Sequence, residues 1–481
     1  MSKKKKHADH STIKQHRRHG KTLTPPLATL PNLKPSSWFN DRLPEMLWAT
    51  LLVTVIPRPE VLATFRGLAD YVSKFSKTDS IHDVTHSGLS EAKSEVLAQL
   101  LEVIVTSDAH RTALTPLLLL RELPAREIWL QVLKTNPSDY DWQILMRAVA
   151  LTLDHQSQEA TDCRWVRLMC MVSTGKIVVP PEFVKEIAYY PNYGDMREVR
   201  PSIRAVEITL ADPEGKTRDW AEKFWMQCLT DTPCFPLQFK DVSKLEIGTT
   251  PDRVRQVYEL LVEHCLKTRK TSTVDARHET VFGVGLYCLS IVQELLRVGA
   301  SQSITGRIAL RTIVEGLIAL AYLANKDDEG LWKTYRVFGA GQAKLAYLKL
   351  EEMEGELSFA NVEELKRLAN EDVWEEYLPI ELGHWLNLDT RKMSELAGVK
   401  DDYDRYFGWT STFAHAHWGA VRDSVFDTCG NPLHRLHRIP RSSSRGLLDV
   451  VPDSCACIDK VLELVSRCYP DFPHRITVKL S

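Results

Sequence analysis

The stretch Ser411–Ser424, STFAHAHWGAVRDS, combines side chains that could transfer protons and bind phosphate. It holds two histidines one residue apart, His415 and His417, and an arginine, Arg422, shortly downstream. An imidazole titrates near neutral pH and can act as a general base or acid, and an arginine can stabilise negative charge on a phosphate. These residue types permit catalysis, nucleic-acid contact or ordinary packing, and their placement decides among the three.

Only isolated glycines and no proline interrupt the sequence from about Asp402 to Phe426, which predicts one continuous helix. At about 100° per residue, Ser411, His415 and Arg422 fall within about 40° of one another. His417 is turned about 160° away from His415, so the two histidines are not expected to act as a pair. The pattern predicts one polar line on a largely buried aromatic helix. His415 is then either a hydrogen-bonded core residue or part of a site.

The sequence from Ile304 to Leu323 is apolar on nearly every helical face, which predicts a buried helix. Arg307, Arg311 and Glu315 nevertheless form a charged stripe at four-residue spacing. Unpaired burial of charges is costly, so the stripe is either a pair within the helix with one arginine reaching solvent, or the polar floor of a pocket. We expect it to face the polar line around His415. The candidate catalytic residues are then His415, Arg422, Arg307, Arg311, Glu315 and Ser411.

A second group of histidines and arginines follows in NPLHRLHRIPRSSSR, residues 431–445. The turn signal Gly-Asn-Pro before it and the Ser/Arg run at its end predict an exposed loop. The forked guanidinium suits phosphate oxygens, so Arg435, Arg438 and Arg441 are candidate phosphate-binding residues. The alternative is a solvated loop that pairs with the acidic segments EEMEGE or DDYD.

The sequence GRIALRTIVEGLIALAYLANKDDEGLWKTYRVFGAGQAKLA, followed by an aromatic segment with Ser-x3-His and Trp-x3-Arg, resembles an uncharacterised bacterial family of helical domains of unknown function. The resemblance covers roughly residues 250–465. That family looks distantly similar to the HEPN helical domains, whose catalytic members are metal-independent ribonucleases in toxin and phage-defence systems. Their signature places an arginine a few residues before a histidine, and a dimer completes the active site. Here the order is reversed, with His415 ahead of Arg422.

The organisation of the chain is predicted from its length and periodicity. A chain of 481 residues exceeds one hydrophobic core and predicts two or three domains. Residues 1–36 are predicted to form a disordered basic arm, which begins MSKKKKHADHSTIKQHRRHGK and ends in a Pro-containing linker. The arm is either a solubilising tail or a contact for nucleic-acid phosphates. Helical domains are predicted for residues 37–240 and 250–481. The candidate for the junction between them is the segment from Thr209 to Arg253, which is rich in Pro, Gly, Asp and Thr and loses the helical periodicity. The expected fold is all-α, an N-terminal antiparallel helical array followed by a HEPN-like helical bundle.

Metal and membrane chemistry are not expected. The ten cysteines include no Cys-x2-Cys pair and no Cys/His spacing typical of tetrahedral zinc, and Cys455 and Cys457 point to different faces of a helix. We therefore expect reduced thiols, no metal and no cofactor. No run reaches the roughly 18 apolar residues that cross a bilayer, and no secretory signal is visible, which predicts a cytoplasmic protein with no membrane partner.

The functional expectation rests on the C-terminal half. Apolar residues make up 44% of the chain and charged residues 26%, and a net charge of -2 excludes a uniformly basic nucleic-acid binder. The leading hypothesis is an intracellular bacterial protein that engages RNA or another phosphorylated partner, as a HEPN-like ribonuclease in phage defence or stress. The alternative is a non-catalytic helical scaffold that binds protein partners or a second copy of itself.

Overall fold

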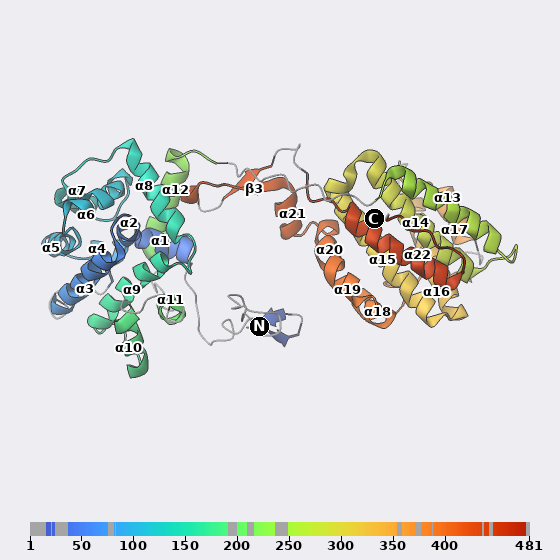
Figure 1. The fold of residues 1–481 in the computed structure, drawn as a ribbon, viewed down its shortest axis with the longest axis horizontal. Coiled ribbons are helices and arrows are strands. Elements are labelled where there is room, and N and C mark those ends of the chain that lie inside the picture. The colour runs from blue at the N-terminus through green and yellow to red at the C-terminus, as the bar shows by residue number, and fades with distance from the viewer. Residues whose placement is uncertain are drawn as a thin grey trace, which may run out of the picture. The chain divides into compact units, whose positions relative to one another are not determined.

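The computed structural model describes residues 16–20, 22–24, 37–75, 81, 83–190, 200–208, 216–235, 249–353, 358–371, 377–386, 388–434, 437–441 and 446–477. Within these ranges helices dominate and the strands are three residues long, so the all-α prediction is confirmed. The chain forms two compact units (Figure 1). Unit 1 comprises Met1–Leu237 and Thr428–Arg438, and unit 2 comprises Gln238–Asp427 and Ile439–Ser481.

The basic arm contains a short antiparallel hairpin, where disorder was predicted. Strand β1 (Arg17–His19) pairs with β2 (Thr22–Thr24) in the register Arg17 to Thr24. Gly20 follows β1 with a positive φ of 59°, a conformation that glycine adopts without steric cost. The disorder prediction is therefore wrong for these residues, and the rest of the predicted arm lies outside the described residues.

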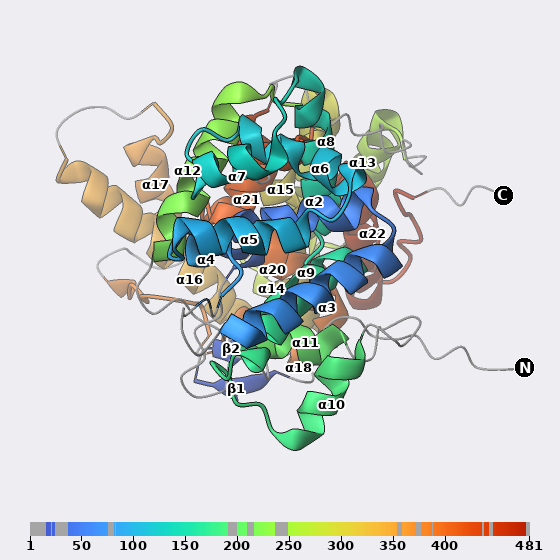
Figure 2. The same cartoon turned by 90° about the vertical axis from the view of Figure 1, so that its left-hand side faces the viewer.

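Unit 1 is a helical assembly around α9, which is buried along most of its length and packs against α2, α3 and α11. In Figure 2, α3 runs across the near side of unit 1, and it packs against both α9 and α5. Helices α2, α3, α5 and α8 lie within residues 37–240, where helical periodicity predicted an array of helices. The helical elements of unit 1 are η3 (Trp38–Arg42), α1 (Leu43–Glu45), α2 (Leu47–Val55), α3 (Arg58–Phe75), α4 (His86–Ser90), α5 (Ser94–Ile104), α6 (Asp108–Leu114), η4 (Thr115–Leu119), α7 (Arg126–Leu133), α8 (Asp139–Thr152), α9 (Gln158–Ser173), α10 (Pro181–Tyr189), α11 (Arg200–Ile208), α12 (Lys216–Asp231) and η9 (Pro432–His434).

Helix α12 lies inside the segment that was interpreted as a domain junction. Trp220, Phe224 and Cys228 recur at four-residue spacing and are all buried in the core of unit 1. The apolar face of α12 was not recognised in the sequence, because Pro- and Gly-containing stretches on either side of it interrupt the helical periodicity. Its last turn leads into Thr232–Phe235, and Leu433 of the returning segment Thr428–Arg438 joins the same core.

Unit 2 is built on a bundle of four long helices, α13, α14, α15 and α22, which pack against one another. Gly316 of α15 permits a close approach to α14, because a Cβ atom there would lie 3.1 Å from the sulfur of Cys288. Helices α18 and α20 cover another side of α15. The helical elements of unit 2 are α13 (Pro251–Thr268), α14 (Ala276–Val298), η6 (Ala300–Gln302), α15 (Ile304–Lys326), α16 (Glu329–Glu351), α17 (Val362–Ala369), α18 (Thr390–Ala397), α19 (Lys400–Asp402), η8 (Tyr403–Phe407), α20 (Gly408–Ala414), α21 (Trp418–Val425) and α22 (Val451–Cys468).

Two of these helices, α14 and α15, are long and apolar enough to cross a membrane by length and composition alone. Core helices of soluble proteins pass the same test, and both helices contribute to the hydrophobic core of unit 2. The sequence prediction required an unbroken apolar run, and α14 and α15 do not contain one because isolated charged or polar residues interrupt each helix.

A two-stranded ribbon connects the end of α21 with the segment that returns to unit 1. Strand β3 (Phe426–Thr428) pairs with β4 (Arg438–Pro440). The chain between the two strands, Thr428–Arg438, clusters with unit 1, although it lies within the range 250–481 that was predicted as the C-terminal domain. The ribbon therefore holds the two ends of this returning segment side by side.

Candidate functional site

The site begins with Arg311 on α15, which gathers three of the predicted side chains around its guanidinium group. Arg311 Nη1 donates to Ser411 Oγ at 3.1 Å and lies 3.3 Å from His415 Nε2. Arg311 Nη2 donates to Glu315 Oε1 at 2.9 Å, one helical turn along α15. The two polar stripes thus meet as expected, and we call Arg311, Glu315, Ser411 and His415 the arginine cluster.

The position of Arg311 is restrained on several sides. Its guanidinium carbon lies 4.8 Å from the centroid of the Phe407 ring, a cation–π distance. One guanidinium nitrogen of Arg311 donates to Glu315, so the Arg311 side chain is oriented toward α20. Only 17% of this side chain is exposed. An arginine that is fixed in this way can bind an anion with little further loss of conformational freedom.

His415 ends helix α20 and is exposed, which differs from the predicted continuous helix. Ala416 adopts a left-handed conformation with φ of 48°, and His417 N–H donates to the Thr412 carbonyl at 2.9 Å. This bond closes a Schellman-type helix end. An alanine in a conformation that glycine favours gives no sequence signal, which is why the break was missed.

The helix break brings the two histidine rings together. The rings of His415 and His417 lie 5.7 Å apart between centroids, with 32° between their planes. The prediction that they do not form a pair is therefore wrong, because the rotation of about 160° holds only for a continuous helix. Since the Arg311 guanidinium can only donate, His415 Nε2 accepts and carries its lone pair in this geometry.

Arg422 lies beyond the break, exposed on α21. Its predicted alignment with Ser411 and His415 depended on one continuous helix and is wrong. The expectation of a largely buried aromatic helix is also wrong at two positions, because Trp409 is 50% exposed and Trp418 is 64% exposed. These indole rings flank the histidine pair in the sequence and are open to solvent.

Arg307 lies one turn before Arg311 on α15 and is only 8% exposed. Its guanidinium carbon is 6.0 Å from the centroid of the Phe413 ring, and among the described residues its Nη1 has no hydrogen-bond partner. Burial lowers the pKa of Arg307, and the carboxylates of Asp423, Asp449 and Asp453 oppose this effect. Arg307 therefore contributes positive charge behind the arginine cluster and not a solvent-exposed contact.

Residues 431–445 were predicted to form an exposed loop, and two of the candidate phosphate-binding arginines in this segment differ from that prediction. Arg438 donates to Thr428 Oγ1 at 2.6 Å. Arg441 Nε lies 3.3 Å from a carboxylate oxygen of Asp427, and only 10% of the Arg441 side chain is exposed. Both arginines hold the β3–β4 ribbon instead of extending into solvent. Arg435 lies outside the described residues.

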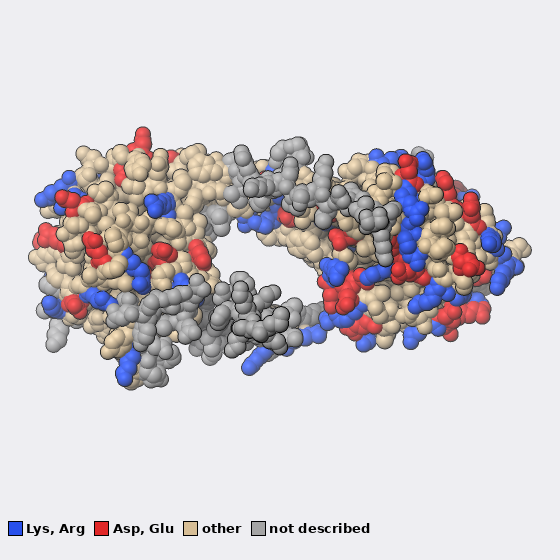
Figure 3. Space-filling model, in the orientation of Figure 1, with Lys and Arg blue, Asp and Glu red and all other residues tan. Residues whose placement is uncertain are grey.

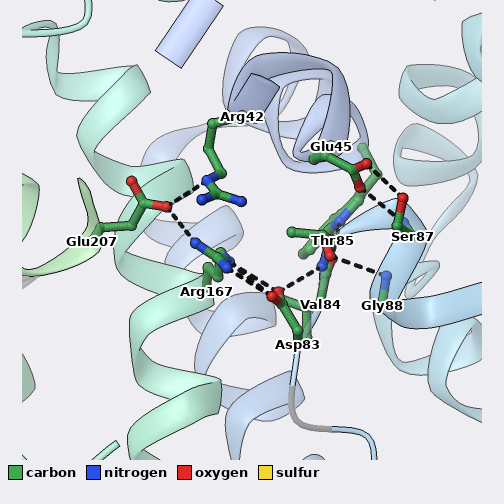
Figure 4. Close-up of polar contacts among 10 residues, drawn as sticks. Arg42, Glu45, Asp83, Val84, Thr85, Ser87, Gly88, Arg167 and Glu207 are labelled. Carbon is green, nitrogen blue, oxygen red and sulfur yellow. Dashed lines mark hydrogen bonds and ion pairs between the residues drawn. The ribbon is translucent and has the colours of Figure 1, made fainter. Parts of the chain in front are cut away.

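Unit 1 contains a network of buried charges that the sequence did not reveal (Figure 4). Glu207 of α11 accepts a hydrogen bond from Arg167 of α9 at 2.6 Å and forms an ion pair with Arg42, whose Nε lies 2.9 Å away. Arg167 also binds Asp83 at 2.7 Å, and Arg164 Nε lies 3.4 Å from Glu207. The three arginines and Glu207 are exposed by only a few per cent, so they serve packing and cannot contact a dissolved substrate.

Four potential metal ligands gather in unit 1, contrary to the expectation that the cysteine and histidine spacing excludes zinc. Their ligand atoms lie within 4.8 Å of one another, and we call them the Cys2His2 group: Cys234, Cys429, His434 and His437. The spacing Cys-x4-His-x2-His in the returning segment is a visible signal. The fourth member comes from the end of α12, two hundred positions before His434. Sequence spacing alone does not predict that distant ligand.

Comparison with known proteins gives one family. Residues 289–431 match a family of unknown function, DUF5677. No curated protein and no solved structure matches the chain. The matched range runs from within α14 to just beyond β3, and it contains the whole arginine cluster and Cys429 of the Cys2His2 group.

Proposed function

We propose that unit 2 binds single-stranded RNA at the arginine cluster and cleaves its backbone without a metal ion. The observation that carries the proposal is the exposed imidazole of His415, whose Nε2 lies 3.3 Å from a guanidinium that Glu315 and Ser411 hold in place. A base beside a fixed cation is the arrangement that phosphodiester cleavage requires.

The reaction would use the adjacent ribose hydroxyl as the nucleophile. A phosphate oxygen replaces His415 Nε2 as an acceptor for Arg311, and the freed Nε2 takes the proton of the 2′-hydroxyl. The 2′-oxygen attacks phosphorus, the bond from phosphorus to the 5′-oxygen breaks, and a protonated His417 donates its proton to that leaving oxygen. The products are a 2′,3′-cyclic phosphate and a free 5′-hydroxyl, and both histidines exchange their protons with water before the next turnover.

Two further features support RNA over a small phosphorylated molecule. Trp409 is 50% exposed and Trp418 is 64% exposed, and unstacked bases bind aromatic side chains with about 1–3 kcal/mol per base. Figure 3 shows Lys and Arg interspersed with Asp and Glu in its view of unit 2, so attraction of the polyanion has to be local. The resemblance to HEPN ribonucleases favours the same chemistry, in the bacterial cytoplasm, in phage defence or stress, as a homodimer.

The test compares cleavage and binding by purified full-length protein in buffer without divalent metal ions. His415→Ala should lower the cleavage rate of a labelled single-stranded RNA by about 100-fold or more and leave the melting temperature nearly unchanged, because His415 is exposed. Arg311→Met should weaken binding of an RNA whose 2′-hydroxyls are replaced by hydrogen, which cannot be cleaved. His384→Ala, an exposed histidine of unit 2 outside the cluster, is the matched control.

The alternative is a non-catalytic scaffold, and the half-exposed Trp409 and Trp418 favour it because exposed indoles are common in protein interfaces. Intact RNA after incubation with the wild-type protein, together with equal binding by wild type and Arg311→Met, would refute the ribonuclease proposal. Binding that depends on Arg311 without any cleavage would reduce it to RNA recognition.

A further inference from the structure

The Cys2His2 group converges on one point from two separate segments of unit 1. Cys234 Sγ lies 3.5 Å from His434 Nδ1 and 3.5 Å from His437 Nε2. Cys429 Sγ lies 3.3 Å from the same His434 Nδ1. Two thiols and one imidazole N–H could also supply these three contacts as hydrogen bonds. What distinguishes the group is that one ligand atom from each of its four residues lies within 4.8 Å of all the others.

We propose that the Cys2His2 group binds one zinc ion in a closed tetrahedral site. Zinc bonds of about 2.3 Å to sulfur and about 2.0 Å to nitrogen place tetrahedral sulfur and nitrogen ligands about 3.5 Å apart. The three sulfur–nitrogen separations of 3.5, 3.5 and 3.3 Å match that value. Two thiolates and two neutral imidazoles in this geometry select zinc over magnesium or calcium, which prefer oxygen ligands.

The surroundings of His434 orient its ring for metal binding. His434 Nε2 lies 3.1 Å from the Thr232 carbonyl oxygen, which can only accept, so Nε2 carries the proton. Nδ1 is left with its lone pair, directed at the two sulfurs. Thr232 Oγ1 accepts a second contact from Nε2 at 2.9 Å, because its own proton goes to the Cys228 carbonyl. Outer partners of this kind fix the tautomer of metal-binding histidines.

The surroundings of Cys429 place two backbone donors at its sulfur atom. The backbone N–H groups of Phe235 and Asn431 both point to Cys429 Sγ at 3.4 Å. Hydrogen bonds of this kind from outside the ligand shell orient the ligand atoms of metal sites. Asn431 Nδ2 in turn donates to the Pro233 carbonyl at 2.8 Å, and Gly430 N–H donates to the Phe235 carbonyl. The two ligand segments are thus connected independently of the ligands.

The role that follows is structural. Four protein ligands fill a tetrahedral shell and leave no position for a substrate. The ion would connect the end of α12 with the returning segment Thr428–Arg438, two hundred positions later in the chain. Among the described residues of that segment, Leu433 is the one that belongs to the buried core of unit 1. Zinc would supply the attachment that apolar burial does not.

The test measures metal content and thiolate–metal bonds in the full chain purified in reductant. We expect one zinc per chain in the wild type, and a cobalt-substituted protein with the sulfur-to-cobalt charge-transfer band and intense visible bands of tetrahedral thiolate coordination. Cys234→Ser should lose both, and the smaller serine side chain fits at this position because Cys234 is exposed. Cys265→Ser, at a half-exposed cysteine of unit 2, should retain both and is the matched control.

Three results would overturn the proposal. The first is wild-type protein that contains no zinc and develops no visible band when Co²⁺ is added. The second is a cobalt spectrum that Cys234→Ser leaves unchanged. The third is a disulfide between Cys234 and Cys429 in protein kept in reductant. If Cys234→Ser fails to fold, His437→Gln replaces it, and loss of the cobalt band in that soluble variant supports the site while its retention refutes it.

Discussion

Replacement of Glu45 by glutamine should remove a pH dependence from the stability of unit 1. Glu45 is 0% exposed, and its carboxylate accepts from Ser87 N–H at 2.8 Å and Ser87 Oγ at 2.6 Å. Burial raises the pKa of Glu45 from 4.5 to about 7, Asp83 adds to this shift, and the Ser87 hydrogen bonds and Arg42 oppose it. The folded state therefore keeps a proton that the unfolded chain releases between pH 4.5 and about 7.

The sign and size of the effect follow from this pKa difference. Because the folded state binds more protons, its free energy of unfolding falls as pH rises through the window from 4.5 to about 7. Each pKa unit corresponds to about 1.4 kcal/mol, so the full loss above the window is about 3 kcal/mol. A glutamine at this position can keep the Ser87 contacts and does not titrate. The free energy of unfolding of Glu45→Gln, taken relative to that of the wild type, should therefore increase by about 3 kcal/mol from pH 4 to pH 8.

The assay is urea unfolding at a series of pH values. The transition is detected by hydrogen-exchange mass spectrometry of peptides from α9. These peptides report the transition of unit 1, because α9 is its central helix. Glu95→Gln, an exposed glutamate on α5, is the control and should follow the wild-type pH profile. Parallel profiles for wild type and Glu45→Gln would refute the reasoning and indicate that water reaches the Glu45 carboxylate.

Two further predictions concern the helix break and the basic arm. Ala416→Gly should raise the free energy of unfolding of unit 2 by about 1 kcal/mol, because φ of 48° strains alanine and suits glycine, and a lower melting temperature would contradict this. Removal of residues 1–21, which hold eight Lys and Arg, should weaken RNA binding and flatten its dependence on salt, as measured by fluorescence anisotropy. Unchanged binding would leave the arm as a solubilising tail.

Periodicity was enough to predict most of the helical fold. Apolar residues at helical spacing identified α3, α13, α14 and α15, because each of these helices buries one long face or nearly all of them. The same geometry predicted that Arg311 and Glu315 face Ser411 and His415. Charged residues on a buried helix need partners, and the second polar line supplied them.

The details that matter for chemistry were not predictable from local patterns. The break at Ala416 carries no glycine or proline, so the pairing of His415 with His417 could not be anticipated. The Arg167–Glu207 pair and the contact of Cys234 with His434 join segments far apart in the chain. Single-sequence reasoning sees the spacing within one element, and these contacts depend on how several elements pack.

Both proposed sites lie where a helix ends, and this has a physical reason. His415 and His417 follow α20, Cys234 follows α12, and His434 ends a short helical turn. Side chains two positions apart in a helix point in different directions, so residues at the spacing of His415 and His417 do not meet within a continuous helix. A chain that leaves a helix can turn two side chains toward one point, while the packed helix behind it holds their positions. In this protein Arg311 on α15 and Thr232 after α12 are the fixed groups, and the histidines beside them are the groups that the helix ends deliver.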